Sequence, residues 1–180
     1  DGTICDTLRD LGECTNRALA DFGLPGHEIE EYRMIVGNGV DTQMKRAIGP
    51  ERYSKELGDR VKAAFKAYYD QNYLCNTRPY DGMPEALDEL KAMGLKIAVF
   101  SNKPDEFAGK VCTELGVEPE ECVYCGDSSV DMDTGANAGI DTIGAEWGFR
   151  GKAELEEHHA GCTISSPSQL PEVLRQLMAE

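Results

Sequence analysis

The stretch CVYCGDSSVDMDTGANAGI, residues 122–140, carries the most informative pattern in this chain of 180 residues. Its first four residues are typical of a short buried strand, and the polar run after them ends that strand. Asp127 and Asp131 lie in this glycine-flanked run, and residues 131–140 are typical of a turn that leads into a short helix. The stretch therefore predicts a strand whose carboxyl end leads two carboxylates into the start of a helix.

The sequence from residue 79 onward alternates between helix-like and strand-like segments. Besides the stretch above, helices are predicted over residues 84–94, 104–117 and 166–180, and strands over residues 95–101, 141–148 and 161–165. This alternation predicts an α/β fold, with a doubly wound, Rossmann-like parallel sheet that has helices on both faces. Sheets of this kind bind their ligands at the carboxyl ends of the strands.

Residues 8–78 have a different character, because their apolar positions recur at helical spacing throughout. Helices are predicted over residues 8–24, 26–37, 39–49 and 51–73, several of them closed by glycine. We therefore expect an all-helical cap domain over residues 8–78. It would be inserted into an α/β core domain made of residues 1–7 and 79–180.

The composition narrows the range of partners. The chain has 33 acidic against 18 basic residues, a net charge of −15, which disfavours binding to nucleic acid or to an anionic membrane. No apolar run approaches the roughly 20 residues of a membrane helix. Seven scattered cysteines fit a reducing cytoplasm. Cys122 and Cys125 form a C-x-x-C motif, for which two thiols beside a buried strand are favoured over a redox pair or half of a zinc site.

Polar residues gather where the predicted strands end. Asp127 and Asp131 follow one strand, and residues 101–103, Ser-Asn-Lys, follow another. The opening Asp-Gly-Thr would follow a strand that this sequence does not contain. Oxygen ligands without histidine or sulfur suit Mg²⁺, while a hydroxyl and a lysine suit a phosphate group. Singly, each residue has a simpler explanation as a helix cap or a solvated charge, but their convergence on one sheet edge favours a site.

Three segments resemble the signature motifs of the haloacid dehalogenase superfamily of phosphatases, most closely the phosphoglycolate phosphatase-like branch. They are DGTICDT (1–7), FSNKP (100–104) and GDSSVDMDTGANAG (126–139), and AEWGFR (145–150) resembles a segment that follows the fourth motif of that branch. The resemblance spans nearly the whole chain. It implies Mg²⁺-dependent hydrolysis of a small phosphate monoester through an aspartyl-phosphate intermediate.

The resemblance also implies roles for single residues. The nucleophilic aspartate of the family would lie two positions before Asp1, outside this sequence, so the chain as written is expected not to turn over substrate by the family route. Asp1 would be the general acid and base, with its carbonyl facing Mg²⁺. Asp127 would bind the metal directly, and Asp131 through a water or by fixing the ligand shell. The phosphate contacts would come from Gly2, Ser101, Asn102 and Lys103, of which Ser101 and Lys103 also act in catalysis.

The predicted cap contains a candidate substrate contact. Asn38 lies between two glycines, and Arg46 and Lys45 follow at a reach suited to a substrate carboxylate, although exposed helix charges are the favoured reading of both cations. His158 and His159 are predicted at a solvated helix end. We expect a small phosphorylated metabolite as partner, and a monomer or homodimer. The alternatives are a phosphate-binding or regulatory protein of the same fold without catalysis, or a phosphatase or mutase for sugar phosphates or pyrophosphate.

Overall fold

The computed structural model describes residues 1–99 and 116–179. The chain divides into two compact units: Cys5–Arg78 with Asp1, and Gly2–Ile4 with Pro79–Glu180. The domain boundaries inferred from the sequence, at residues 7/8 and 78/79, stay a prediction. In the part of the chain that the structure describes, no helix has both the length and the apolar character needed to cross a membrane.

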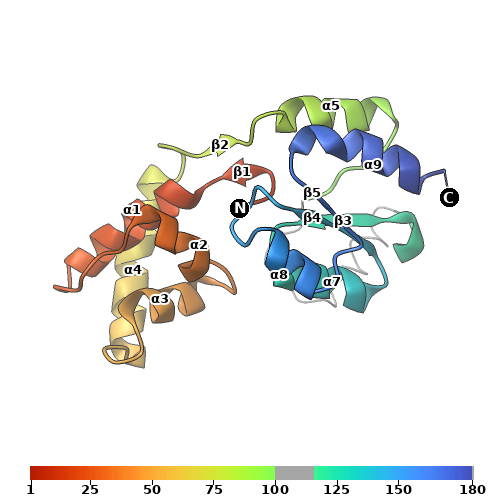
Figure 1. The fold of residues 1–180 in the computed structure, drawn as a ribbon. Helices are drawn as coiled ribbons and strands as arrows, with labels where there is room; N and C mark the ends of the chain where they lie inside the picture. The colour runs from red at the N-terminus through yellow and green to blue at the C-terminus, as the bar shows by residue number, and fades with distance from the viewer. Residues whose placement is uncertain (100–115, 180) are drawn as a thin grey trace. The chain divides into compact units, whose positions relative to one another are not determined.

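The first unit is helical, as its sequence predicted (Figure 1). Two short strands, β1 (Cys5–Asp6) and β2 (Arg78–Pro79), pair at the ends of this segment. Between them lie α1 (Leu8–Ala20), the 3-10 turn η1 (Ile29–Glu31), α2 (Tyr32–Ile35), α3 (Val40–Ile48) and α4 (Lys55–Asn72).

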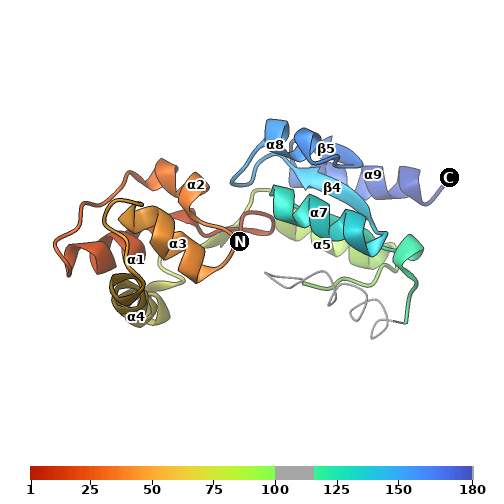
Figure 2. The ribbon, with the colours of Figure 1, turned by 90° about the horizontal axis from the view of Figure 1, so that it is seen from below.

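Helix α4 is the long element of this unit, and α1 and α3 pack against it (Figure 2). Its buried face carries Val61 and Phe65, four positions apart, which is the spacing that brings residues onto one side of a helix. The helix begins after Ser54, whose hydroxyl accepts a hydrogen bond from the amide of Leu57 at 3.2 Å. Burial of this stripe holds the helices together, since most of the stability of helices in proteins comes from packing of their apolar face.

The second unit contains a parallel sheet with strand order β3-β4-β5. Its strands are β3 (Val123–Gly126), β4 (Asp141–Ala145) and β5 (Cys162–Ile164), with Gly126 opposite Gly144 and Ala145 opposite Ile164. Its helices are α5 (Met83–Ala92), α7 (Ser129–Ala138), α8 (Lys152–Glu157) and α9 (Leu170–Leu177), with short 3-10 turns η2 (Pro119–Glu121) and η3 (Pro167–Gln169).

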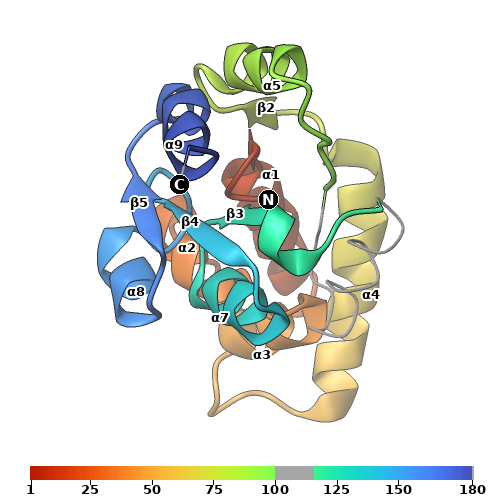
Figure 3. The same cartoon turned by 90° about the vertical axis from the view of Figure 1, so that its right-hand side faces the viewer.

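Helices cover both faces of this sheet (Figures 1 and 3). On one face α5 and α9 enclose a core formed by Met83, Ile143, Ile164 and Leu170. On the other face α7 and α8 pack against the strands. The predicted α/β fold with a doubly wound parallel sheet is confirmed, and so are the strands predicted around residues 122–126, 141–148 and 161–165.

One predicted strand is wrong. Residues 95–99 form no strand, and Val99 is 77% exposed instead of buried. The backbone of a strand needs a hydrogen-bonding neighbour, and within residues 1–99 and 116–179 no strand pairs with this segment. The rest of that strand, residues 100–101, and most of the helix predicted over residues 104–117 lie outside the described residues.

Candidate functional site

The carboxylate of Asp127 lies at the carboxyl end of β3 and is buried, with 5% of the residue exposed. Its Oδ1 accepts a hydrogen bond from the Thr3 hydroxyl at 3.0 Å, and its Oδ2 accepts one from the backbone amide of Phe149 at 2.8 Å. Three segments far apart in the sequence therefore meet at this one side chain.

Burial raises the pKa of Asp127, and the nearby Asp131 carboxylate acts in the same direction, whereas the hydrogen bonds from Phe149 and Thr3 oppose the rise. Among the described residues, the groups around Asp127 thus do not fully compensate the burial of its charged form. A cation beside this carboxylate would supply the missing compensation.

Two glycines make room for this carboxylate. A Cβ on Gly2 would lie 2.1 Å from Oδ2 of Asp127, and a Cβ on Gly148 would lie 2.1 Å from Cβ of Asp127. Gly2 also has a φ of +76°, in the left-handed region that side chains disfavour. Both positions therefore need glycine for the backbone to approach Asp127 this closely.

Asp131 faces its own loop. Its Oδ2 accepts hydrogen bonds from the amides of Asp127 and Ser128, at 3.1 and 3.0 Å, and from the Ser128 hydroxyl at 2.7 Å. Its Oδ1 accepts one from the Tyr124 hydroxyl at 3.0 Å, and burial, with the Asp131 charge, raises the pKa of Tyr124 so that it stays a donor. Asp131 thus forms a capping box with Ser128 and fixes the loop that presents Asp127.

The segment after β4 supports the Gly2–Thr3 turn. The indole Nε1 of Trp147 donates to the carbonyl oxygen of Thr3 at 2.9 Å, and the ring of Tyr80 packs edge-on against the indole at 6.3 Å between centroids. The Tyr80 amide donates to the carbonyl of Ile4 at 3.1 Å. Sequence reasoning missed Thr3, Trp147 and Phe149 as site residues, although they lie in the quoted segments DGTICDT and AEWGFR.

Helix α8 fixes the start of α7. Oε1 of Glu154 accepts a hydrogen bond from the amide of Ser129 at 3.0 Å and lies 3.7 Å from Nε of Arg150, whose side chain is buried. Glu154 therefore satisfies an amide of the first turn of α7 that has no partner within the helix.

Among the other predicted site residues, Asn38 and Arg46 belong to the helical unit. Asp1 is exposed and directly precedes Gly2, while residues 101–103 lie outside the described residues. In the helical unit, the Arg46 guanidinium donates to Oδ1 of Asn38 at 3.0 Å and to the carbonyl of Ile35 at 3.3 Å. Asn38 has a φ of +57°. Arg46 thus holds the loop between α2 and α3 from within its own unit.

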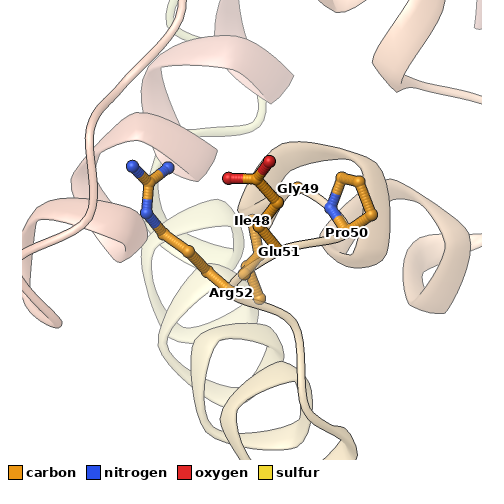
Figure 4. A pocket seen from close by; sticks show the side chains of 5 residues that line it. All are labelled: Ile48, Gly49, Pro50, Glu51 and Arg52. Atoms are coloured by element: carbon orange, nitrogen blue, oxygen red, sulfur yellow. The ribbon is translucent and has the colours of Figure 1, made fainter.

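A hollow of about 210 Å³ lies at the turn between α3 and α4 (Figure 4). The side chains of Glu51 and Arg52 project from this turn, and the residues that line the hollow are Ile48, Gly49, Pro50, Glu51 and Arg52. No residue predicted for the site is among them.

The cysteines and histidines form no metal centre in residues 1–99 and 116–179, where no group of three or more His, Cys, Asp or Glu side chains is arranged to hold a metal ion. Burial raises the pKa of the Cys125 thiol to about 12, which disfavours the reactive thiolate form. Cys122 donates to the carbonyl of Glu118 at 3.4 Å, and Nδ1 of His158 lies 3.0 Å from Asp133. These contacts favour structural roles for the C-x-x-C motif and for the His158–His159 pair.

Comparison with known families decides the affiliation. The family model described as haloacid dehalogenase-like hydrolase matches residues 1–111 and 99–145. The chain belongs to the haloacid dehalogenase-like hydrolases. The resemblance inferred from the motifs is therefore confirmed, and the chain is a hydrolase of this family.

Individual relatives agree with this affiliation. A phosphoglycolate phosphatase of Aquifex aeolicus is 25% identical, with 100% of this chain and 96% of the relative covered. An N-acetylmuramic acid 6-phosphate phosphatase of Pseudomonas aeruginosa is also 25% identical, over 100% of this chain and 94% of the relative. The crystal structure of a predicted phosphoglycolate phosphatase from Haemophilus somnus has a TM-score of 0.88 at 22% identity, covering 97% of this chain and 94% of that one, and shows the shared fold.

Proposed function

We propose that this protein is a Mg²⁺-dependent phosphatase that hydrolyses a small phosphate monoester. The observation that carries the proposal is the buried carboxylate of Asp127 at the carboxyl end of β3, held by Thr3 and Phe149 and enclosed by two glycines. The names of the curated relatives, which are phosphatases, support the same class of reaction.

The residues present fit Mg²⁺. The ion prefers oxygen ligands and is usually held by one or two carboxylates, several waters and the substrate phosphate, so a cluster of three side chains is not needed. Asp127 and the backbone carbonyl of Asp1 would hold it, and Asp131 would act through a water or by fixing the loop. When bound, the ion supplies positive charge that offsets the repulsion between an anionic phosphate and an attacking carboxylate.

The remaining roles rest on the family resemblance. The nucleophile would be an aspartate two positions before Asp1, and Asp1 would protonate the leaving group and then take a proton from the attacking water. The amide of Gly2 would donate to a phosphate oxygen. Further phosphate contacts would come from the side chains of Ser101 and Lys103 and from the amide of Asn102.

The substrate class that we propose is a phosphate monoester that also carries a carboxylate. Phosphoglycolate and N-acetylmuramic acid 6-phosphate, named for the two relatives, share these two groups. In the helical unit, Asn38 and Arg46 are the candidates for contact with the carboxylate, which would pair with the guanidinium. The protein is further proposed to act in the cytoplasm as a monomer or homodimer, without a nucleic-acid or membrane partner.

The test is release of inorganic phosphate by the complete gene product. Phosphoglycolate, N-acetylmuramic acid 6-phosphate, glucose 6-phosphate and pyrophosphate are compared at equal concentration, with Mg²⁺ and with EDTA. We expect turnover of a carboxylate-bearing ester that EDTA abolishes and Mg²⁺ restores. Phosphate binding without turnover of any ester would favour the phosphate-binding alternative, and an asparagine two positions before Asp1 in the gene would support that alternative.

A further inference from the structure

Trp147 is the single tryptophan of the chain, and the reaction outlined above gives it no role. It lies two residues beyond the end of β4, half-buried against the core of the second unit. Its ring packs on the apolar side, next to Tyr80, while its one polar atom, Nε1, donates to the carbonyl oxygen of Thr3 at 2.9 Å. The mostly apolar indole of Trp147 thus donates its one hydrogen bond to the Gly2–Thr3 turn.

That turn leads directly to Asp127. The Thr3 hydroxyl donates to Oδ1 of Asp127 at 3.0 Å, so the carbonyl and the hydroxyl of Thr3 connect Trp147 to the carboxylate in two hydrogen bonds. Two residues after Trp147, the amide of Phe149 donates to Oδ2 of Asp127 at 2.8 Å. The segment after β4 therefore holds one carboxylate oxygen directly and the other through Thr3.

Holding both oxygens restricts rotation of the carboxylate. Groups behind the direct ligands of a metal orient those ligands, and their loss typically lowers metal affinity by about 10- to 100-fold. The adjacent Gly2 has the conformational freedom of a glycine with positive φ, so it does little to fix Thr3. The Trp147 hydrogen bond is thus the contact that ties the Thr3 carbonyl to the sheet.

We propose that Trp147 is a positioning residue for the metal site: its indole N–H fixes the Gly2–Thr3 turn, and Thr3 in turn orients Asp127 for Mg²⁺. This inference rests on the proposed function, because it presumes that Asp127 binds Mg²⁺. It assigns to Trp147 no contact with substrate or metal.

The experiment compares Mg²⁺ binding by isothermal titration calorimetry in the complete gene product and three variants. Trp147→Phe keeps an aromatic ring and removes the N–H, Thr3→Val removes the hydroxyl at nearly constant shape, and the third variant combines both. We expect each single variant to bind Mg²⁺ about 10-fold more weakly. Because both changes act on one chain of contacts, the double variant should bind about as weakly as either single one.

A control separates this role from general loosening of the core. Leu174 packs against the same core cluster as Trp147, so Leu174→Ala disturbs the packing and leaves both hydrogen bonds in place. We expect it to destabilise the fold and to keep the Mg²⁺ affinity of the original protein. A second readout is activity against Mg²⁺ concentration. The half-saturating concentration should rise in Trp147→Phe, whereas kcat at saturating Mg²⁺ should return to within about twofold of the original.

The outcomes distinguish the two proposals. If the original protein binds no Mg²⁺, the proposed function fails. If it binds Mg²⁺ and Trp147→Phe binds it equally well, or if Leu174→Ala weakens binding as much, only the positioning role is overturned. If circular dichroism shows that Trp147→Phe does not fold, the comparison of Thr3→Val with Thr3→Ser replaces it, since serine keeps the hydroxyl. Equal Mg²⁺ affinity in those two variants would then overturn the positioning role.

Discussion

The backbone amide of Asp127 donates to Oδ2 of Asp131 at 3.1 Å. The two carboxylates of the GDSSVD motif therefore have different tasks, although a motif alone presents them as a pair. Asp131 turns back onto its own loop and satisfies the amides there, whereas Asp127 faces the Gly2–Thr3 turn and the segment after β4. The different surroundings lead to different expectations for their substitution.

Replacing Asp127 by asparagine should remove the stabilisation that Mg²⁺ gives to the fold. A ligand present at a hundred times its dissociation constant stabilises the native state by about 2.7 kcal/mol, which corresponds to roughly 5–10 °C in Tm for a chain of this size. Differential scanning fluorimetry at increasing Mg²⁺ should show this rise in the original protein and none in Asp127→Asn. Phosphatase activity should fall with it. An equal rise of Tm in both proteins would show that Asp127 is not a ligand of the metal.

Replacing Asp131 by asparagine should weaken the fold first. Four donors from three residues lose a charged acceptor, so we expect the free energy of unfolding to drop by about 2–3 kcal/mol in urea titration. Mg²⁺ affinity should fall by about tenfold, less than in Asp127→Asn, because Asp131 acts on the loop. Unchanged stability together with complete loss of Mg²⁺ binding would instead identify Asp131 as a direct ligand.

Gly2→Ala should displace Asp127. The added Cβ would lie 2.1 Å from Oδ2, and it would also strain a backbone with φ of +76°. Gly139→Ala is the matched control, since Gly139 has a φ of +70° and nothing within 4 Å of an added Cβ. Both variants should lose about 1–2 kcal/mol of stability from the strained backbone. Only Gly2→Ala should lose Mg²⁺ binding in calorimetry, and loss of binding in the control as well would show that strain alone explains the effect.

Elements with local sequence signals were predicted correctly, whereas features that depend on a distant partner in the chain were missed or predicted wrongly. Residues 122–140 contain a strand, a capping box and a helix within one stretch, and the predicted strand and helix formed there, although the helix begins at Ser129, whereas a turn at residue 131 had been predicted. The apolar run at residues 95–99 is no strand, because strand formation depends on a neighbour that periodicity does not reveal. Likewise, the bond from Trp147 to Thr3 joins residues 144 positions apart, which no spacing rule connects.

Substitution of Arg46 tests whether its guanidinium holds the loop between α2 and α3 or binds the substrate carboxylate. Its guanidinium donates to Asn38 and to backbone carbonyls of that loop, and lysine lacks the fork geometry to bond several of them at once. The proposed pairing with the substrate carboxylate predicts that Arg46→Lys raises KM for phosphoglycolate more than for ethyl phosphate, which has no carboxylate. A rise of similar factor for both substrates would contradict that proposal and leave Arg46 the role of holding the loop.

Asp10 should make the helical unit sensitive to acid. The residue is 2% exposed, and its two carboxylate oxygens accept hydrogen bonds from the amides and side chains of Asn76 and Thr77, at 2.8 to 3.0 Å. Burial raises the pKa of Asp10, but the hydrogen bonds from Asn76 and Thr77 together outweigh it and lower the pKa below 3.8. A lowered pKa means that the charged form stabilises the folded state above pH 3.8, and that this stabilisation is lost as the pH falls through the folded-state value.

The variant Asp10→Asn presents an amide group to these donors and should lose about 2–3 kcal/mol of unfolding free energy at pH 7. The difference between the original protein and the variant should shrink as the pH falls below 3.8, because protonation takes the same acceptor away from the original protein. Urea titrations at pH 7 and at lower pH measure this. Asp70→Asn, at an exposed position of α4, is the control and should change stability by less than about 0.5 kcal/mol. A stability difference between the original protein and Asp10→Asn that stays constant down to the acid limit of folding would mean that packing around the side chain, and not its charge, holds α1 to the chain after α4.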